Sequence, residues 1–239
     1  VGTPSLEDGQ ADLSYVIRVA EELLGCMNEY KVIVVKSTVP VGTVELMRSI
    51  LCREKVESRD FDIVSNPEFL QEGNGLRDFF DPDRIVLGSH SEKAVEIVRQ
   101  LHYPIIYRQV GATYSKDQDG GTQHRGRSKE RESVPVVETT IASAQMIKYA
   151  SNAFLAARIS VINEIAALCE QVGADIKEVS EGMGYDNRIG HAYLSAGLGF
   201  GGPCLEKDLR ALIKIAEASG QEVHTLKAVL ERNEKQIGD

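Results

Sequence analysis

Residues 31–39 read KVIVVKSTV, and this stretch decides the fold class. It holds an uninterrupted run of β-branched residues, which suits a strand buried on both faces of a parallel sheet. Working outward, the spacing of apolar residues predicts helices over 13–27, 44–51 and 93–101, and Asp12 is placed to cap the first. Further strands are predicted over 61–65, 84–88 and 104–107. Strands that alternate with helices indicate an α/β sheet.

The second half of the chain has a different character. Residues 141–172 carry apolar residues at helical spacing and end at Gly173, which predicts one long helix with a glycine cap. Shorter helices are predicted over 176–181, 205–218 and 222–237, so this part is expected to be all-α. Between the halves, residues 115–133 contain no large apolar side chain and are predicted to be a disordered loop. We expect one domain over residues 1–138 and a second over 139–239.

Composition excludes some classes of partner. The 239 residues have a formal net charge of -9, and neither nucleic acids nor anionic membranes attract an acidic surface. A phosphate-bearing ligand stays possible, because a few cations and backbone N–H groups suffice. No run approaches the ~18–20 apolar residues of a membrane span, and nothing resembles a signal peptide. The four scattered cysteines predict neither a metal site nor disulfides, and indicate the reducing cytoplasm.

The sharpest motif is GFGGPCLEKD, residues 199–208. A glycine-rich stretch leads into a helix whose first turn carries Cys204, and the N–H groups at a helix start stabilise a thiolate. Lys207 adds positive charge, and Asp208 lies four residues on, hence on the same face. Cys204 and Asp208 can serve as nucleophile and general base. The alternative is a buried structural cysteine.

Two further pairs have the i,i+4 spacing that places side chains on one helix face. Lys148 and Asn152 on the long helix could stabilise an oxyanion, or could belong to a solvated polar face. Glu68 and Glu72 follow the strand over 61–65, at the edge of an α/β sheet where ligands bind, or they mark an exposed helix start. Thr38, at another strand end, could contact a ligand or cap the next helix.

Taken together, the motifs resemble the UDP-glucose/GDP-mannose dehydrogenase family from Val1 to about Gln236. The matching segments are VGTPSLEDGQADLS, KSTVPVGT, SNPEFLQEG, DPDRIVLG, MIKYASNAFLAARISVINEIA, NRIG and GFGGPCLEKD. The resemblance implies the second half of a Rossmann-like NAD-binding domain, followed by an all-α central domain whose long helix forms a homodimer core.

The resemblance also assigns roles to residues. Cys204 would be the catalytic thiol, and the reacting C6 would be surrounded by Lys148, Asn152, Asp208, Glu72 and Thr38. The residues toward NAD would be Thr3, Thr38, Glu72 and Lys207. The nucleotide-sugar pocket would be lined by Glu68, Lys148, Asn152, Arg188, Tyr193 and Gly201.

The implied reaction oxidises the C6 alcohol of a nucleotide sugar to a carboxylate with two molecules of NAD. Cys204 would hold the aldehyde as a thiohemiacetal, which a second hydride transfer converts to a thioester that water hydrolyses. UDP-glucose is the expected substrate, because GFGG…KD is close to that subgroup. GDP-mannose and UDP-N-acetyl sugars are the alternatives, and a non-catalytic fragment or interaction module is a third reading.

Two departures from the family pattern bear on activity. Pro203 replaces the usual serine and removes an N–H, and Glu206 replaces the usual proline and opposes thiolate formation. The family's GxGxxG fingerprint, expected before VGTP, does not occur there because the chain starts at Val1. We therefore expect the sequence to be a fragment that binds NAD poorly by itself.

Overall fold

The computed structural model describes residues 1–110 and 132–236 and divides them into two compact units. Unit 1 comprises Val1–Thr3 and Asp12–Lys148, and unit 2 comprises Pro4–Ala11 and Tyr149–Asp239. The boundary falls inside one long helix, so each unit contains part of it. The predicted disordered loop over 115–133 lies almost entirely outside the described residues.

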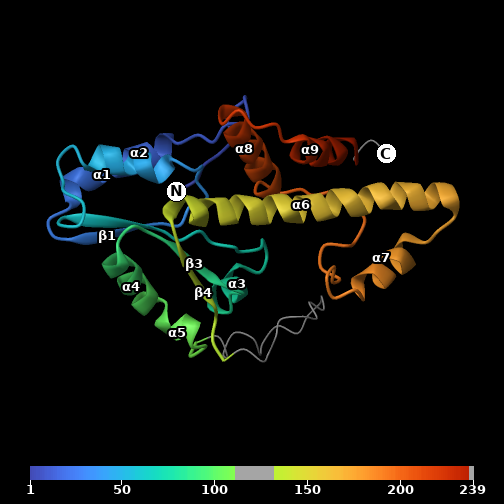
Figure 1. The fold of residues 1–239 in the computed structure, drawn as a ribbon, viewed down its shortest axis with the longest axis horizontal. Coiled ribbons are helices and arrows are strands. Elements are labelled where there is room, and N and C mark those ends of the chain that lie inside the picture. Colours follow the sequence, from blue (N-terminus) through green and yellow to red (C-terminus); the bar gives the residue numbers. More distant parts are fainter. Residues whose placement is uncertain (111–131, 237–239) are drawn as a thin grey trace. The chain divides into compact units, whose positions relative to one another are not determined.

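Unit 1 is an α/β sheet unit, as predicted (Figure 1). Its helices are α1 (Ser14–Cys26), α2 (Thr43–Leu51), α3 (Gly75–Phe80), α4 (Glu92–Leu101), α5 (Tyr103–Ile106) and the first two turns of α6. Its strands are β1 (Lys31–Val35), β2 (Phe61–Ser65), β3 (Ile85–Gly88) and β4 (Val136–Thr139). Unit 2 holds the remainder of α6 (Ile141–Val172) with α7 (Ile176–Gly184), α8 (Leu205–Ala218) and α9 (His224–Gln236).

The four strands lie in the order β1-β2-β3-β4. β1 pairs with β2 in parallel and β3 pairs with β4 in parallel, whereas β2 and β3 are antiparallel and share a single pair, Ser65 and Gly88. The sheet is therefore mixed and not purely parallel. Gly88 has no room for a side chain, because a Cβ there would lie 2.6 Å from Ala144 Cβ.

Two cores lie on the two faces of the sheet, since alternate strand residues point to opposite sides. Ile33, Phe61 and Ile63 pack with the buried residues of α1 and α2. Val32, Val34 and Val64 pack in the second cluster, to which α4 and α5 contribute. β2, buried along its whole length, is the central strand that both cores share.

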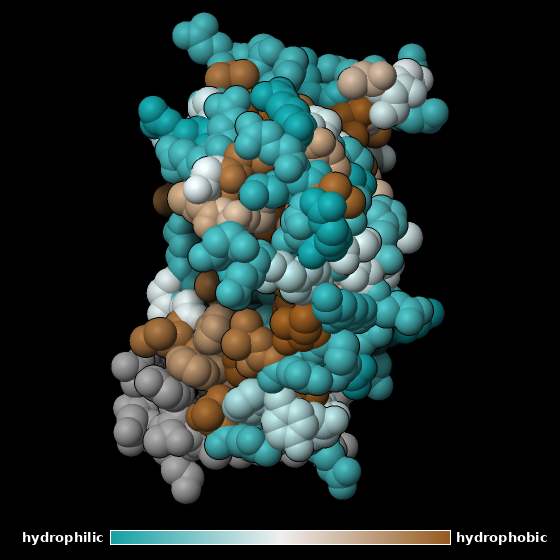
Figure 2. All heavy atoms as spheres, turned by 90° about the vertical axis from the view of Figure 1, so that its left-hand side faces the viewer, coloured by the Kyte–Doolittle hydropathy of each residue, from teal (hydrophilic) through white to brown (hydrophobic). Residues whose placement is uncertain are grey.

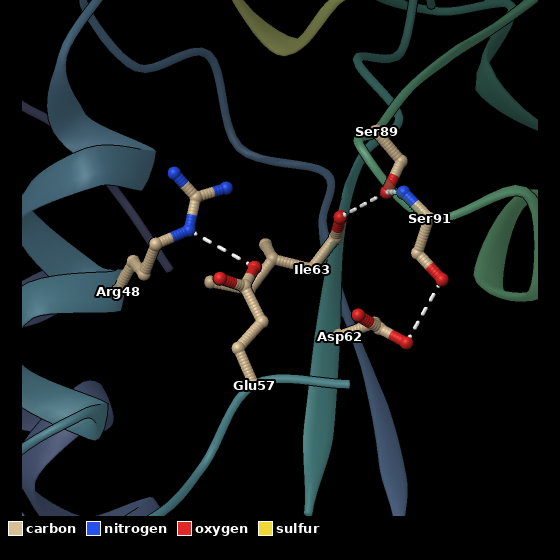
Figure 3. A network of polar contacts seen from close by, with 6 residues as sticks. All are labelled: Arg48, Glu57, Asp62, Ile63, Ser89 and Ser91. Atoms are coloured by element: carbon tan, nitrogen blue, oxygen red, sulfur yellow. Dashed lines mark hydrogen bonds and ion pairs between the residues drawn. The ribbon is translucent and has the colours of Figure 1, made fainter. Parts of the chain in front are cut away.

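β2 carries a buried carboxylate, that of Asp62. Asp62 accepts hydrogen bonds from the Ser91 hydroxyl at 2.9 Å and the Tyr30 hydroxyl at 2.7 Å. Figure 3 shows the Asp62–Ser91 contact beside the bond from the Ser89 hydroxyl to the Ile63 carbonyl and the Arg48–Glu57 ion pair. Ser91 also caps α4 by accepting from the Ala94 N–H. These contacts fix α4 against the sheet.

β1 differs from its prediction. It ends at Val35, and Val32, Ile33 and Val34 are only partly buried, because no described strand pairs with its outer edge. Figure 2, which looks at the molecule from the left-hand side of Figure 1, shows apolar side chains in brown gathered on the lower half of that face. The expectation of a strand buried on both faces is wrong for the described residues.

The sequence also mispredicted one element and missed others. Residues 104–107 were expected as a strand, but Tyr103–Ile106 form α5, because Pro104 at its first turn favours a helix start and supplies no N–H to a strand. The strand that pairs with β3 is instead β4, which was not predicted. The short helix α3 was also missed.

The helical elements of unit 2 were predicted closely. α6 and α8 have the predicted bounds, and Gly173 adopts a φ of 76° just beyond α6. The core of unit 2 lies where α6, α8 and α9 meet, around Ala156, Phe200 and Leu209. α6 is long and apolar enough to cross a membrane by length and composition. Core helices of soluble proteins pass the same test, and burying Lys148 and Asn152 in lipid would be costly.

Candidate functional site

The carboxyl end of β1 brings two predicted residues together. The Thr3 hydroxyl donates to the backbone carbonyl of Thr38 at 2.8 Å, and Thr3 is buried. Thr38 does not cap α2, whose N-cap is Gly42. The Asn66 N–H donates to the carbonyl of Val35, so the loop that follows β2 starts beside the end of β1. These loops leave the same edge of a parallel strand pair, where ligands of α/β sheets bind.

Asn66 organises the loop that carries the predicted carboxylates. Its side-chain amide donates to the carbonyl of Val86 at 2.9 Å, and its oxygen accepts from the Lys36 ammonium at 3.0 Å. Glu68 accepts from the Leu70 N–H at 2.6 Å, which turns the loop locally, and Glu72 is exposed. Glu68 and Glu72 precede α3, so they are loop residues and not a pair on a helix face.

Lys148 lies in the interior and not on a solvated face, because its residue is 6% exposed. Its ammonium is 5.3 Å from the centre of the Phe69 ring, and the Arg84 guanidinium is 3.7 Å from the same ring. Phe69 is thus shared by two cations. A cavity of about 60 Å³ lies against this loop, lined by Lys36, Asn66, Glu68, Phe69 and Arg84 among others.

Unit 2 contains a second group of predicted residues, centred on Asp208. The Asp208 carboxylate is 1% exposed and accepts from the Asn152 amide at 2.6 Å and from the Lys207 ammonium at 2.6 Å. A carboxylate with two donors at this distance stays in one place. Asn152 and Lys207 were predicted to hold an oxyanion and NAD, and in this structure both contact Asp208.

Tyr149 was missed by the sequence analysis. Its side chain is completely buried, and within the described part of the chain its hydroxyl has no hydrogen-bond partner. Burial, and next the negative charge of Asp208, raise the pKa of the Tyr149 phenol above its usual range. Tyr149 is therefore a neutral hydroxyl near the carboxylate. No sequence signal distinguished it from the apolar residues of α6.

Cys204 is exposed and is the N-cap residue of α8, so it is not a buried structural cysteine. Its carbonyl accepts from the Asp208 N–H at 3.0 Å, the first turn of the helix. The Glu206 carboxylate accepts from Arg210 at 2.9 Å. That ion pair offsets the negative charge that Glu206 brings near the thiol.

A cavity of about 700 Å³ lies within unit 2, and the residues on both sides of Cys204, Pro203 and Glu206, line it. Its other walls are the loop over 4–9, Gly202, and residues of α8 and α9 that include Lys207 and Glu234. Gly201 is exposed, and a Cβ there would meet no atom within 4 Å. This side of the glycine-rich loop is open to a ligand.

Arg188 and Tyr193 lie on the segment between α7 and the glycine-rich loop. The Arg188 guanidinium pairs with Asp186 two residues away, and its side chain is 88% exposed. Tyr193 adopts a φ of 60°, which is uncommon for a bulky residue. Among the described residues, no group of three or more His, Cys, Asp and Glu could hold a metal ion.

Both halves of the chain match domains of one family. Residues 1–106 match the NAD binding domain of the UDP-glucose/GDP-mannose dehydrogenase family, and residues 142–235 match the family's central domain. The chain belongs to the UDP-glucose/GDP-mannose dehydrogenase family. This confirms the resemblance and the α/β fold class expected from the sequence motifs.

Individual relatives agree with this assignment. The chain is 45% identical over 236 residues to the UDP-glucose 6-dehydrogenase TuaD of Bacillus subtilis, an alignment that covers 99% of this chain and 45% of TuaD. Its fold is similar to that of a UDP-glucose dehydrogenase from Pyrobaculum islandicum, with a TM-score of 0.82, 38% identity, and coverage of 98% of this chain and 49% of that one. A GDP-mannose dehydrogenase from Pseudomonas aeruginosa has a TM-score of 0.63 at 29% identity, with 100% and 50% covered. The chain spans about half the length of these relatives.

Proposed function

We propose that the protein carrying this sequence oxidises the C6 alcohol of a nucleotide sugar to a carboxylate with NAD, and that UDP-glucose is the substrate. The observation that carries the proposal is the start of α8. Cys204 is exposed there, and one turn further on Asp208 is buried and held by Asn152 and Lys207. An accessible thiol beside a fixed carboxylate is the arrangement that covalent aldehyde oxidation requires.

In the proposed reaction, Cys204 acts on the aldehyde that the first oxidation produces. Its sulfur adds to the aldehyde carbon to give a thiohemiacetal, and loss of a hydride from that carbon gives a thioester. Asp208, with Glu72, accepts protons from the attacking water, which releases the carboxylate and the free thiol. Lys148 and Asn152 stabilise the oxyanions, and for Asn152 this means sharing its amide between Asp208 and the substrate.

NAD, when bound, accepts the hydride in each of the two oxidations. The chain's residues fit its nicotinamide end, because Thr3 and Thr38 lie together at the carboxyl end of β1, and Lys207 lines the cavity beside Cys204. The pyrophosphate end has a weaker match. Gly197, Gly199 and Gly202 have GxGxxG spacing, but they follow a loop and not a strand.

The choice of UDP-glucose rests on relatives. Those named for UDP-glucose share 45% and 38% identity with this chain, whereas the structure named for GDP-mannose shares 29%. GDP-mannose and UDP-N-acetyl sugars are the alternative substrates. We assign the nucleotide-sugar pocket to Glu68, Arg188, Tyr193 and Gly201.

We further propose a homodimer formed by α6 in its central domain. Phe154, Val161 and Leu168 are 67%, 52% and 61% exposed and recur every seven residues, so they form one apolar stripe along the helix. A seven-residue apolar repeat is the pattern by which two helices pack. We also propose a reducing compartment such as the cytoplasm, because the four cysteines are widely scattered in the sequence.

The test is a substrate panel with the native protein. UDP-glucose, GDP-mannose and a UDP-N-acetyl sugar are each incubated with NAD, and NADH is followed by absorbance. We expect NADH with UDP-glucose and far less with the others. If no sugar yields NADH, and Cys204 is no more reactive toward iodoacetamide than Cys52, the alternative of a non-catalytic module holds instead.

A further inference from the structure

One asparagine bonds to both backbone groups of a residue in the glycine-rich loop that precedes Cys204. The Asn233 side chain, on α9, accepts from the Phe200 N–H at 2.7 Å and donates to the Phe200 carbonyl at 3.0 Å. Both backbone groups of one loop residue are thereby bonded to one amide. This two-point contact fixes the peptide orientation on each side of Phe200, as a neighbouring strand would.

Gly199 is shaped to admit this contact. It adopts a φ of 94°, and a Cβ at that position would lie 2.5 Å from Asn233 Oδ1. Any other residue would both strain the backbone and push the amide away. The contact between Asn233 and Phe200 therefore requires glycine at position 199, and we call this contact the Asn233 latch.

Two more side chains hold the loop just before the latch. The Gln236 amide donates to the Gly197 carbonyl at 2.9 Å, and the Asn163 amide oxygen accepts from the Gly197 N–H at 2.8 Å. Asn163 is buried on α6, so the loop is tied to two helices of the unit 2 core. The anchored part ends at the buried Phe200, and residues 201–204 are exposed.

We propose that Asn233 is a positioning residue, which sets the place of the Cys204 thiol through the backbone of the glycine-rich loop. Three residues separate Phe200 from Cys204, namely Gly201, Gly202 and Pro203, and all three are exposed. The position of the loop before Cys204 consequently depends on the latch, while α8 fixes the chain after it. The catalytic consequence rests on the proposed function, but the effect on the loop does not.

Hydrogen exchange tests the latch directly. Compared with the native protein, the Asn233→Ala variant should show amide exchange about tenfold faster in the peptide over 197–204, because two hydrogen bonds are lost. Peptides from α4 in unit 1 should not change. Gly199→Ala should give the same result, and the double variant should be no faster than either single one, because both changes break one contact.

Two control variants separate the latch from general destabilisation. Ser160→Ala removes the buried bond from the Ser160 hydroxyl to the Val229 carbonyl, which also joins α6 to α9 but does not touch the loop. Gly220→Ala imposes a side chain at a φ of 70° in open space at the end of α8. Both should lower the melting temperature without changing exchange in 197–204.

The role in positioning is read from Cys204 itself. Peptide mass spectrometry of iodoacetamide-treated protein should show alkylation of Cys204 about tenfold slower in Asn233→Ala, because reactivity depends on the surroundings of the thiol and a loosened loop no longer holds it in one place at the start of α8. Cys52 provides an internal reference. If the substrate panel shows turnover, kcat should fall at least tenfold with little change in the KM for NAD, and Asn233→Asp, which keeps the acceptor, should recover part of it.

The outcomes are distinct. Unchanged exchange and alkylation in Asn233→Ala would overturn the proposal even in an active enzyme. Faster exchange with unchanged alkylation would show a structural contact and would equally refute positioning. Loss of both loop protection and thiol reactivity in a protein that oxidises no nucleotide sugar would uphold the latch and refute the proposed function alone.

Discussion

At the scale of single residues, the buried charges show how the candidate site is maintained. Lys148 and Asp208 are both nearly inaccessible, yet each has a compensating neighbour: the Phe69 ring for the ammonium, and the Asn152 and Lys207 donors for the carboxylate. A buried charge without a compensating neighbour costs roughly several kcal/mol of folding stability. A protein that buries a charge therefore either offsets this cost with neighbouring groups or accepts it for the sake of function. The contacts here offset it locally.

Replacing Lys148 tests the oxyanion role. Lys148→Met keeps the apolar stem of the side chain and removes the charge, so turnover should fall on the order of 10²–10³-fold, the usual loss for one such donor. Phe69→Leu is the matched control, because it leaves the ammonium and removes only the ring, worth about 0.5–2 kcal/mol. Steady-state kinetics and thermal melts of both variants check this. Unchanged turnover with a large drop in melting temperature for Lys148→Met would assign it a structural role.

The Tyr30–Asp62 contact predicts a pH dependence of stability. Burial, followed by the hydrogen bond to Asp62, raises the pKa of Tyr30 to about 12 from 10.0. Because the Tyr30 phenol ionises less readily in the folded protein than in the unfolded chain, its contribution to the free energy of unfolding is fully present below pH 10. This contribution is lost as the pH rises toward 12. Tyr30→Phe cannot ionise and should lose less stability over that window. Urea unfolding at several pH values checks this, and parallel curves for the two proteins would contradict it.

At the scale of elements, the helices were easier to predict than the strands. α8 has strong apolar periodicity and α6 is a long apolar stretch, both have clear ends, and their predicted bounds were correct. β4 has only four residues, and its pairing with β3 depends on long-range contacts that no local pattern encodes. α5 was predicted as a strand because its apolar run is too short for periodicity to separate the two.

The residues of the candidate site could be predicted in part, whereas the contacts between them could not. Motifs identified Cys204, Lys148, Asn152 and Asp208, because their spacing on helices can be counted along the sequence. Spacing could not reveal that Asn152 and Lys207 donate to Asp208, or that Phe69 faces Lys148, since these contacts join distant segments. Asn233 was missed for that reason, being 33 residues from the backbone it holds.

The apolar stripe on α6 predicts an association between copies of the chain. Val161→Glu places a charge at its centre and should convert a dimer to a monomer, because burying an unpaired carboxylate opposes packing. Light scattering after size-exclusion chromatography measures the mass. Glu170→Gln, exposed on the opposite face of the same helix, is the control. A Val161→Glu protein that keeps the mass of a dimer would contradict the assignment of α6 to the interface.

At the scale of the whole molecule, the two compact units carry different parts of the proposed chemistry. Unit 1 presents Thr3, Thr38 and the loop with Glu68 and Glu72, and unit 2 presents Cys204 with the Asp208 group. α6 runs through the boundary, with Lys148 on one side and Asn152 on the other.

Residues 1–239 alone should bind NAD weakly. The pyrophosphate needs a turn with GxGxxG spacing between a strand and a helix, and no strand in the described residues is followed by that spacing. The unpaired edge of β1 should also favour self-association. Isothermal titration of this polypeptide with NAD checks the expectation. A dissociation constant in the micromolar range would contradict the expectation, because it would show that residues 1–239 are sufficient for tight NAD binding.

The most direct test of the account is the joint measurement of NADH and carboxylate in the native protein and its Cys204→Ser variant. With UDP-glucose, the native protein should form about two NADH for each UDP-glucuronate, because oxidation of an alcohol to a carboxylate removes four electrons and each NAD accepts two. The variant should form no carboxylate, though slow alcohol–aldehyde exchange can persist without the thiol. Carboxylate formation by Cys204→Ser at a rate near that of the native protein would contradict the central claim that Cys204 is the nucleophile.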